Sequence, residues 1–258
     1  MTERALLTVA FSTLLERAPG ISAEGIGPET EVLVCVQGGQ LGQLPRLPQA
    51  RVVPVPGRGV AKSRNAAIAH ATGRYLLFCD DDVVIDPEGI AAGIRHLQQT
   101  GHALALGRAV DPSGVMRKKY PRSVTRLTLY NSAKAATYEM LVDLDQIRAK
   151  DLWFDERFGA GAPLHLGDEY IFISDLLRAG LSGDAVPEIF GRHPVVSSGS
   201  RWGTPEDSHA RAVAINRVFG DRALWARVAF GLKNRDSLGH WRLLMSFIGN
   251  RTRPPRGV

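Results

Sequence analysis

Short apolar runs alternate with helix-like stretches through the first half of the chain. The runs have the length of buried strands, and the longer stretches between them carry apolar residues at helical spacing. In chain order they are "LLTVAFST", "EVLVCVQ", "RVVPV", helix-like "GVAKSRNAAIAHATG", "YLLFC", helix-like "PEGIAAGIRHLQQTG", and "ALALGRAV". This alternation predicts an α/β fold with a mostly parallel sheet flanked by helices.

The pattern weakens and then returns in the second half. Residues 111–137 are rich in Gly, Pro and basic side chains, which favours an insertion without regular structure. Regularity resumes with "YEMLVDLDQI", the helix "DEYIFISDLLRAG" and the strand-like "DAVPEIF", and the rest is helical. We therefore expect one domain over residues 1–205, followed by a helical C-terminal extension with a basic tail over residues 206–258.

Three aspartates, Asp80, Asp81 and Asp82, follow the apolar run "YLLFC" directly. Capping of the next helix does not explain them, because the segment 86–88, "DPE", already supplies a cap, a first-turn proline and a first-turn acid. Adjacent carboxylates at the lip of a buried strand repel one another, a cost that a divalent cation and its ligand would offset. The carboxyl ends of parallel strands are also where ligands bind. A ligand and metal site is therefore favoured over a solvated turn.

Arg64 stands out in the helix-like stretch before this strand. It lies three residues from Ala61 and four from Ile68, so it shares their apolar side. A charge there needs an anionic partner, either a nucleotide diphosphate or one of the aspartates. The alternative is an arginine whose stem packs while its head reaches water. Lys62 and Asn65 are lesser candidates for the same ligand.

Two further segments carry candidate chemistry. "FGAGAPLHLGDEY" brings Asp168 and Glu169 into the first turn of a helix, where acids are routine partners of the helix dipole, but its glycines allow close approach to a ligand. "GRHPVVSSGSRWG" contains His193, for which a structural role and metal ligation remain alternatives.

The combined stretch "GVAKSRNAAIAHATGRYLLFCDDD" resembles the glycosyltransferases of family 2, which have the GT-A fold and an Asp-x-Asp motif at the end of such a strand. The resemblance covers roughly residues 5–200. It implies that Asp80 contacts the sugar nucleotide and that Asp82, with Asp80, holds Mn²⁺ or Mg²⁺. It also places Ser12 and Thr13, at the end of the first strand, against the nucleotide. The second strand ends in Gln37, where the family usually has an aspartate that contacts the base.

The resemblance extends to the second half of the site. The family's "G-E-D" type motif supplies the base that deprotonates the acceptor hydroxyl in an inverting transfer, whereas this chain reads Gly-Asp-Glu. By position Glu169 is the expected base, with Asp168 as the alternative. In many enzymes of this fold a histidine completes the metal coordination, which makes His193 a candidate ligand. Arg201 and Trp202 would then border the acceptor.

Charge and composition limit the partners. The net charge of +6 resides mostly in the C-terminal tail, so the near-neutral body argues against nucleic acid. The stretch "SLGHWRLLMSFIG" has Leu238, Trp241, Leu244, Met245 and Ile248 at helical spacing, which favours docking on the core, with contact to an anionic membrane as the alternative. Cys35 and Cys79 lie in strand-like runs, and no signal or membrane-spanning segment is evident. We expect a cytoplasmic protein, with the inner face of the membrane as an alternative location.

These observations predict a metal-dependent glycosyltransferase that uses a nucleotide-sugar donor and a glycan or lipid-linked acceptor, as in bacterial-type cell-surface glycan or glycoconjugate synthesis. Two alternatives remain. One is a nucleotidyltransferase, whose acids would bind the same metal-phosphate group. The other is a non-enzymatic module that binds anions through the basic cluster near residues 117–126 and the tail.

Overall fold

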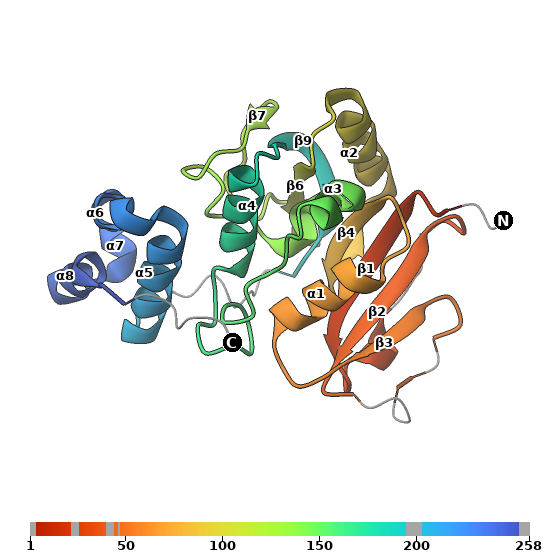
Figure 1. The fold of residues 1–258 in the computed structure, drawn as a ribbon, viewed down its shortest axis with the longest axis horizontal. Helices are drawn as coiled ribbons and strands as arrows, with labels where there is room; N and C mark the ends of the chain where they lie inside the picture. Colours follow the sequence, from red (N-terminus) through yellow and green to blue (C-terminus); the bar gives the residue numbers. More distant parts are fainter. Residues whose placement is uncertain (1–3, 22–25, 40–43, 46, 195–202, 253–258) are drawn as a thin grey trace.

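A mixed sheet forms the centre of the computed structural model, which describes residues 4–21, 26–39, 44–45, 47–194 and 203–252 (Figure 1). The strand order is β3-β2-β1-β4-β8-β6-β9-β5, and β7 pairs with β9. The strands are β1 (Leu7–Leu14), β2 (Glu31–Gln37), β3 (Arg51–Val55), β4 (Tyr75–Asp80), β5 (Val84–Ile85), β6 (Leu104–Val110), β7 (Thr125–Arg126), β8 (Met140–Asp143) and β9 (Gly183–Arg192).

The sheet is parallel in its first half and mixed in its second. Strands β1 to β4 run parallel, as do β6 and β9, whereas β8 is antiparallel to both β4 and β6. The short β5 and β7 each pair antiparallel with β9. The predicted α/β class with a mostly parallel sheet is confirmed, and the predicted strands lie within a residue or two of the observed ones.

Helices cover both faces of the sheet. They are α1 (Val60–His70), α2 (Pro87–Thr100), α3 (Leu144–Ala149) and α4 (Asp168–Arg178). Because side chains alternate across a strand, β4 sends Leu76 and Phe78 into one core cluster and Leu77 and Cys79 into the other. The first cluster contains apolar residues of α1, α3 and α4, and the second contains those of α2. The sheet therefore separates two cores.

Helix α2 begins as its sequence indicates. The Asp86 side chain accepts a hydrogen bond from the Gly89 N–H at 3.1 Å, and Pro87 occupies the first turn. A Cβ atom on Gly89 would lie 1.7 Å from the Ile189 carbonyl oxygen, so only glycine allows α2 to lie this close to β9. Asp86 thus caps the helix, and the aspartates before it are free for another role.

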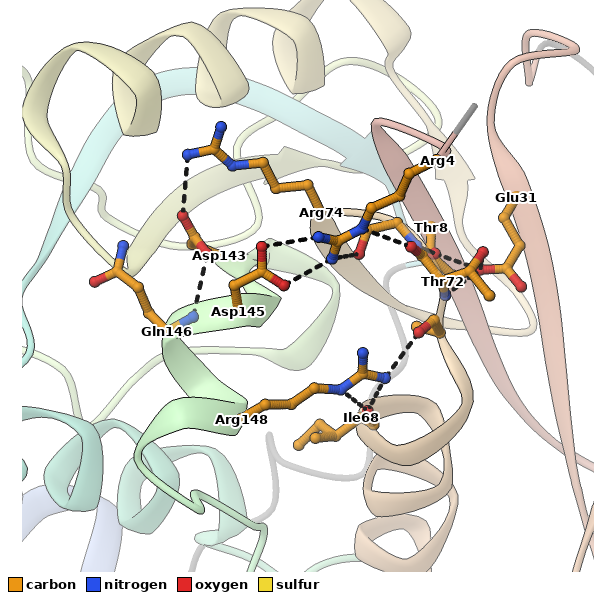
Figure 2. A network of polar contacts seen from close by, with 12 residues as sticks. Arg4, Thr8, Glu31, Ile68, Thr72, Arg74, Asp143, Asp145, Gln146 and Arg148 are labelled. Atoms are coloured by element: carbon orange, nitrogen blue, oxygen red, sulfur yellow. Dashed lines mark hydrogen bonds and ion pairs between the residues drawn. The ribbon is translucent and has the colours of Figure 1, made fainter. Parts of the chain in front are cut away.

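A polar network closes the edge of the sheet where the central parallel strands begin (Figure 2). Arg4 makes two hydrogen bonds to Asp145, at 2.7 and 2.9 Å. Arg148 donates to the carbonyl oxygens of Ile68 and Ala71 at the end of α1, the shortest bonds being 2.6 and 2.7 Å. These contacts tie the N-terminal segment and α3 to the end of α1.

The C-terminal helices pack on α4. They are α5 (Pro205–Phe219), α6 (Ala223–Lys233), α7 (Arg235–Leu238) and α8 (Trp241–Gly249). Tyr170 and Ile171 of α4 share a third core cluster with α5, α6 and α8. The division at residue 205 stays a prediction. Among the described residues, no helix is long and apolar enough to cross a membrane.

The prediction of which residues of the last helix pack against the rest of the protein is wrong in part. Helix α8 buries Leu243 and Phe247, whereas Trp241 and Met245 are 69% and 57% exposed. Because α8 is apolar on more than one side, its spacing alone did not identify the packed side.

Candidate active site

The aspartate turn lies at the carboxyl edge of the sheet, as expected. Asp80 is the last residue of β4 and is paired in register with Ser12 of the neighbouring β1. The turn borders a pocket of about 560 Å³. The sequence-predicted residues that line this pocket are Ser12, Thr13, Gln37, Arg64, Asp80, Asp81, Asp82, Asp168, Glu169 and His193. Segments that are far apart in the chain thus meet in one cavity.

Other predicted residues are not brought to this pocket. Lys62 and Asn65 are absent from the described residues that line it. The Asn65 amide instead pairs with the Phe154 backbone, accepting from its N–H at 2.7 Å and donating to its carbonyl at 3.0 Å. Asn65 therefore joins α1 to the loop before α4. Arg201 and Trp202 lie outside the described residues.

Asp81 fastens the turn to β1. Its side chain is 8% exposed, accepts a hydrogen bond from the Thr13 hydroxyl at 2.6 Å, and forms an ion pair with Arg17. Both carboxylate oxygens of Asp81 therefore have partners, one in β1 and one in the segment that follows it. This position explains a middle aspartate for which the local sequence offers no reason.

Asp82 and His193 come together from different strands. The His193 Nε2 atom lies 3.4 Å from Asp82 Oδ1, and His193 Nδ1 lies 2.7 Å from the Pro194 carbonyl oxygen. A carbonyl can only accept, so Nδ1 carries a proton, and Nε2 is the ring nitrogen that faces Asp82. Metal-binding histidines are commonly oriented by such a carbonyl. Tyr138 stacks on the His193 ring, with ring centroids 4.6 Å apart. The donor set fits a divalent cation.

Arg64 joins the two acidic segments. It is 4% exposed and forms ion pairs with Asp168, with Glu169 at 3.3 Å, and with Asp80 at 3.8 Å. Its guanidinium also lies over the Phe154 ring, 5.5 Å from the centroid. Of the two expectations for Arg64, an anionic partner within the site describes the structure better than a head group in water.

The carboxyl groups around Arg64 differ in their protonation. Burial, joined by the neighbouring Glu169 carboxylate, raises the pKa of Asp168 to about 7. Burial also acts to raise the pKa of Glu169, but Arg64 and the Thr137 hydroxyl, which donates at 2.7 Å, together lower it. Burial raises the pKa of Asp80, and Arg64 opposes this. At neutral pH, Glu169 is thus the more fully ionised member of the α4 pair.

Replacing Arg64 with alanine should destabilise the fold by about 3–5 kcal/mol, because it leaves buried carboxylates without their cation. Urea unfolding would measure the loss. The matched control is Arg235→Ala, since Arg235 is 72% exposed and pairs with an exposed Asp236, and such surface pairs contribute about 1 kcal/mol or less. Arg64→Lys keeps the charge and should recover part of the loss. Equal stability of Arg64→Ala and the control would contradict a central role for Arg64.

Two glycine-containing loops meet at the pocket. The Val60 N–H donates to the Ala160 carbonyl at 2.9 Å, and Gly59 N–H donates to the Gln37 side-chain oxygen at 2.9 Å. Gly159 has φ of +95°, and a Cβ atom there would lie 2.8 Å from Asp168 Cγ. The glycines before α4 therefore allow close packing against α1 and Asp168, while Ala160 and Gly161 line the pocket.

Several pocket residues were not identified from the sequence. They are Arg17, Arg58, Thr137, Tyr138 and His165. Arg58 had the clearest signal, because it sits in "PGRGV" immediately before α1. The others lie in segments without a motif, so their position depends on long-range packing.

Known proteins resemble this chain in sequence over part of its length and in fold. Residues 40–153 match the family described as glycosyl transferase family 2. None of the curated proteins matches the chain. Among solved structures, S. aureus TarS 1–349 in complex with UDP is 18% identical, with a TM-score of 0.55 over 89% of this chain and 71% of that one.

Two other complexes are similar in fold. TarS 1–349 in complex with UDP-GlcNAc is 17% identical, with a TM-score of 0.55 over 89% of this chain and 72% of that one. The mannosyltransferase PcManGT from Pyrobaculum calidifontis, in complex with GDP-Man and Mn²⁺, is 16% identical, with a TM-score of 0.57 over 95% of this chain and 74% of that one. These neighbours share the fold of the chain.

Proposed function

We propose that the protein is a metal-dependent, inverting glycosyltransferase, a proposal supported by the match of residues 40–153 to glycosyl transferase family 2. It moves a sugar from a nucleoside-diphosphate sugar to an acceptor hydroxyl. The observation that carries this proposal is one pocket that combines the Asp82 and His193 pair with the Arg64, Asp168 and Glu169 cluster.

The donor side of the pocket is formed by the ends of β1, β2 and β4. Asp82 and His193, with Asp80, would hold Mn²⁺ or Mg²⁺, which would supply positive charge to the departing diphosphate. Ser12, Thr13 and Gln37 line the same part of the pocket and would contact the nucleoside. The Gln37 side-chain oxygen is bonded to Gly59, so its NH₂ group would donate to the base or ribose.

The acceptor side is formed by the first turn of α4. The acceptor oxygen bonds to the anomeric carbon, the bond from that carbon to the diphosphate breaks, and Glu169 takes the hydroxyl proton. Arg64 and Thr137 support this role because they favour the ionised carboxylate of Glu169. Asp168, buried and paired with Arg64, fits a positioning role.

The acceptor is proposed to be a glycan or lipid-linked molecule at the cytoplasmic face of the membrane. Trp225 and Trp241 are 74% and 69% exposed on the C-terminal helices, and Arg242 lies beside Trp241. Aromatic and basic side chains together favour the surface of an anionic membrane.

The basic cluster near residues 117–126 supports a non-enzymatic anion-binding module less well than the pocket supports an enzyme. The Lys118 ammonium lies 2.6 Å from Glu139 Oε2, and Tyr120 donates to the other oxygen of this fully buried carboxylate at 2.7 Å. The charge of Lys118 is therefore used inside the fold.

A panel of sugar nucleotides tests the proposed function. We expect one nucleoside diphosphate and its sugar conjugates to raise the melting temperature in Mn²⁺ and not in EDTA, with about 2.7 kcal/mol of stabilisation at a hundredfold excess over Kd. Incubation with the selected donor should release nucleoside diphosphate. Release of pyrophosphate would instead indicate a nucleotidyltransferase, and the absence of any nucleotide effect would contradict the proposal.

A further inference from the structure

A second cluster of side chains that can bind a metal ion lies where β6 and β9 begin, at the edge of the sheet opposite the active site. His96 in the last turns of α2, His102 before β6, and Asp184 in β9 have ligand atoms within 4.8 Å of one another. His96 Nε2 and His102 Nδ1 each lie 2.9 Å from the same oxygen, Asp184 Oδ2. Across the described ranges of the chain, no other trio of histidine, cysteine or carboxylate side chains meets this criterion.

The backbone holds this trio in place. Asp184 is paired in register with Ala105 of β6 and with Arg126 of β7, so its position is set from both sides. Its side chain is 8% exposed, and those of His96 and His102 are 18% and 19% exposed. The site is thus partly buried and still open to an entering ion.

The distances are close to those of a metal site. Zinc bonds to imidazole nitrogen and carboxylate oxygen are about 2.0–2.2 Å, so neighbouring ligand atoms in a tetrahedron are separated by roughly 3.3 Å. The two separations of 2.9 Å between an imidazole nitrogen and Asp184 Oδ2 need to widen by only a few tenths of an ångström, and the two nitrogens lie within 4.8 Å of each other. Three protein ligands would leave a fourth position for water.

Arg126 is the competing cation. Its NH1 atom lies 2.6 Å from His102 Nε2 and 3.8 Å from Asp184 Oδ1, and its side chain is 53% exposed. An arginine only donates, so His102 Nε2 accepts from it and Nδ1 carries the proton that faces Asp184. Metal binding at Nδ1 would move this proton to Nε2, and Arg126 would have to turn outward. In the absence of a metal ion, the Arg126 guanidinium is the cation beside His102 and Asp184.

We propose that His96, His102 and Asp184 bind one Zn²⁺ ion at a site separate from the donor metal. Two imidazoles and one carboxylate favour Zn²⁺ over Mn²⁺ or Mg²⁺. Asp184 and His193 lie near opposite ends of β9, nine residues or about 30 Å apart along an extended strand. The ion therefore ties the end of α2 to β6 and β9, and it takes no part in sugar transfer.

The test is Zn²⁺ titration of the metal-stripped full chain by calorimetry, in an Asp82→Ala background so that the donor site does not contribute. We expect one Zn²⁺ per chain. His96→Gln and His102→Gln should each weaken binding by at least about tenfold, whereas His70→Gln, at an exposed histidine, should not. Arg126→Ala should tighten binding, which a purely structural ion-pair network does not predict.

Co²⁺ binding to the chain with intact histidines provides a second readout that needs no substitution at the site. Tetrahedral Co²⁺ with imidazole ligands should absorb strongly in the visible range, and Zn²⁺ should abolish the band. The proposal is overturned if no Zn²⁺ binds at micromolar concentration, or if binding survives the double replacement of His96 and His102. Mn²⁺-dependent transfer by His96→Gln should equal that of the unmodified enzyme, which separates this site from the proposed function.

Discussion

Replacing Asp82 with alanine is expected to abolish metal-dependent donor binding and to lower turnover by at least about a thousandfold. A metal that neutralises a departing diphosphate stabilises the transition state by several kcal/mol, and each 1.36 kcal/mol is a factor of ten in rate. Asp82 is 38% exposed and follows the end of β4, so its loss should leave the fold intact. Donor release assays across a Mn²⁺ titration would measure the effect.

The control for this variant is Asp236→Ala, which removes a carboxylate that is 96% exposed on α7. It should bind donor and metal as the unmodified chain does. His193→Ala should give a smaller effect, shifting the Mn²⁺ concentration for half-maximal activity upward, because one neutral ligand is lost while Asp82 and Asp80 remain. Normal Mn²⁺-dependent turnover by Asp82→Ala would rule out this metal site.

Replacing Glu169 with glutamine should lower kcat by about 10²–10⁴-fold while donor binding is retained. Glutamine preserves the size of the side chain and its contact with Thr137, but it cannot take a proton from the acceptor. Because the pKa of Glu169 is lowered from its ordinary value, the acidic limb of the wild-type kcat profile should lie below the range usual for a glutamate. Kinetics with saturating donor and varied acceptor would check both expectations.

Asp168→Asn is the matched comparison for the base. Asp168 is buried at 2% exposure and paired with Arg64, so its replacement should affect stability more than the proton transfer itself. A larger loss of kcat in Asp168→Asn than in Glu169→Gln, with both variants folded, would reverse the two roles. Equal donor affinity in the two variants would confirm that the difference concerns the acceptor step.

The strands and helices could be predicted because their patterns are local. Strand β4 is a short continuous apolar run, which is the pattern of a strand buried on both faces, and Leu76 and Leu77 enter opposite cores. Asp86 and Pro87 begin α2 through contacts within one turn. The packed side of α8 could not be predicted, because Trp241 and Leu243 are both apolar and only the position of α6 and α5 distinguishes them.

The sequence by itself determined the α/β fold and the position of Asp80 to Asp82 at the carboxyl edge of the sheet. Both follow from short-range periodicity and from the rule that parallel strands end at a common edge. The tertiary structure decided which groups face one another. Asp81 meets Thr13, Arg64 meets Asp168, and Asp82 meets His193 across 68, 104 and 111 residues of chain. Such pairings depend on how the strands are ordered in the sheet, which no local pattern records.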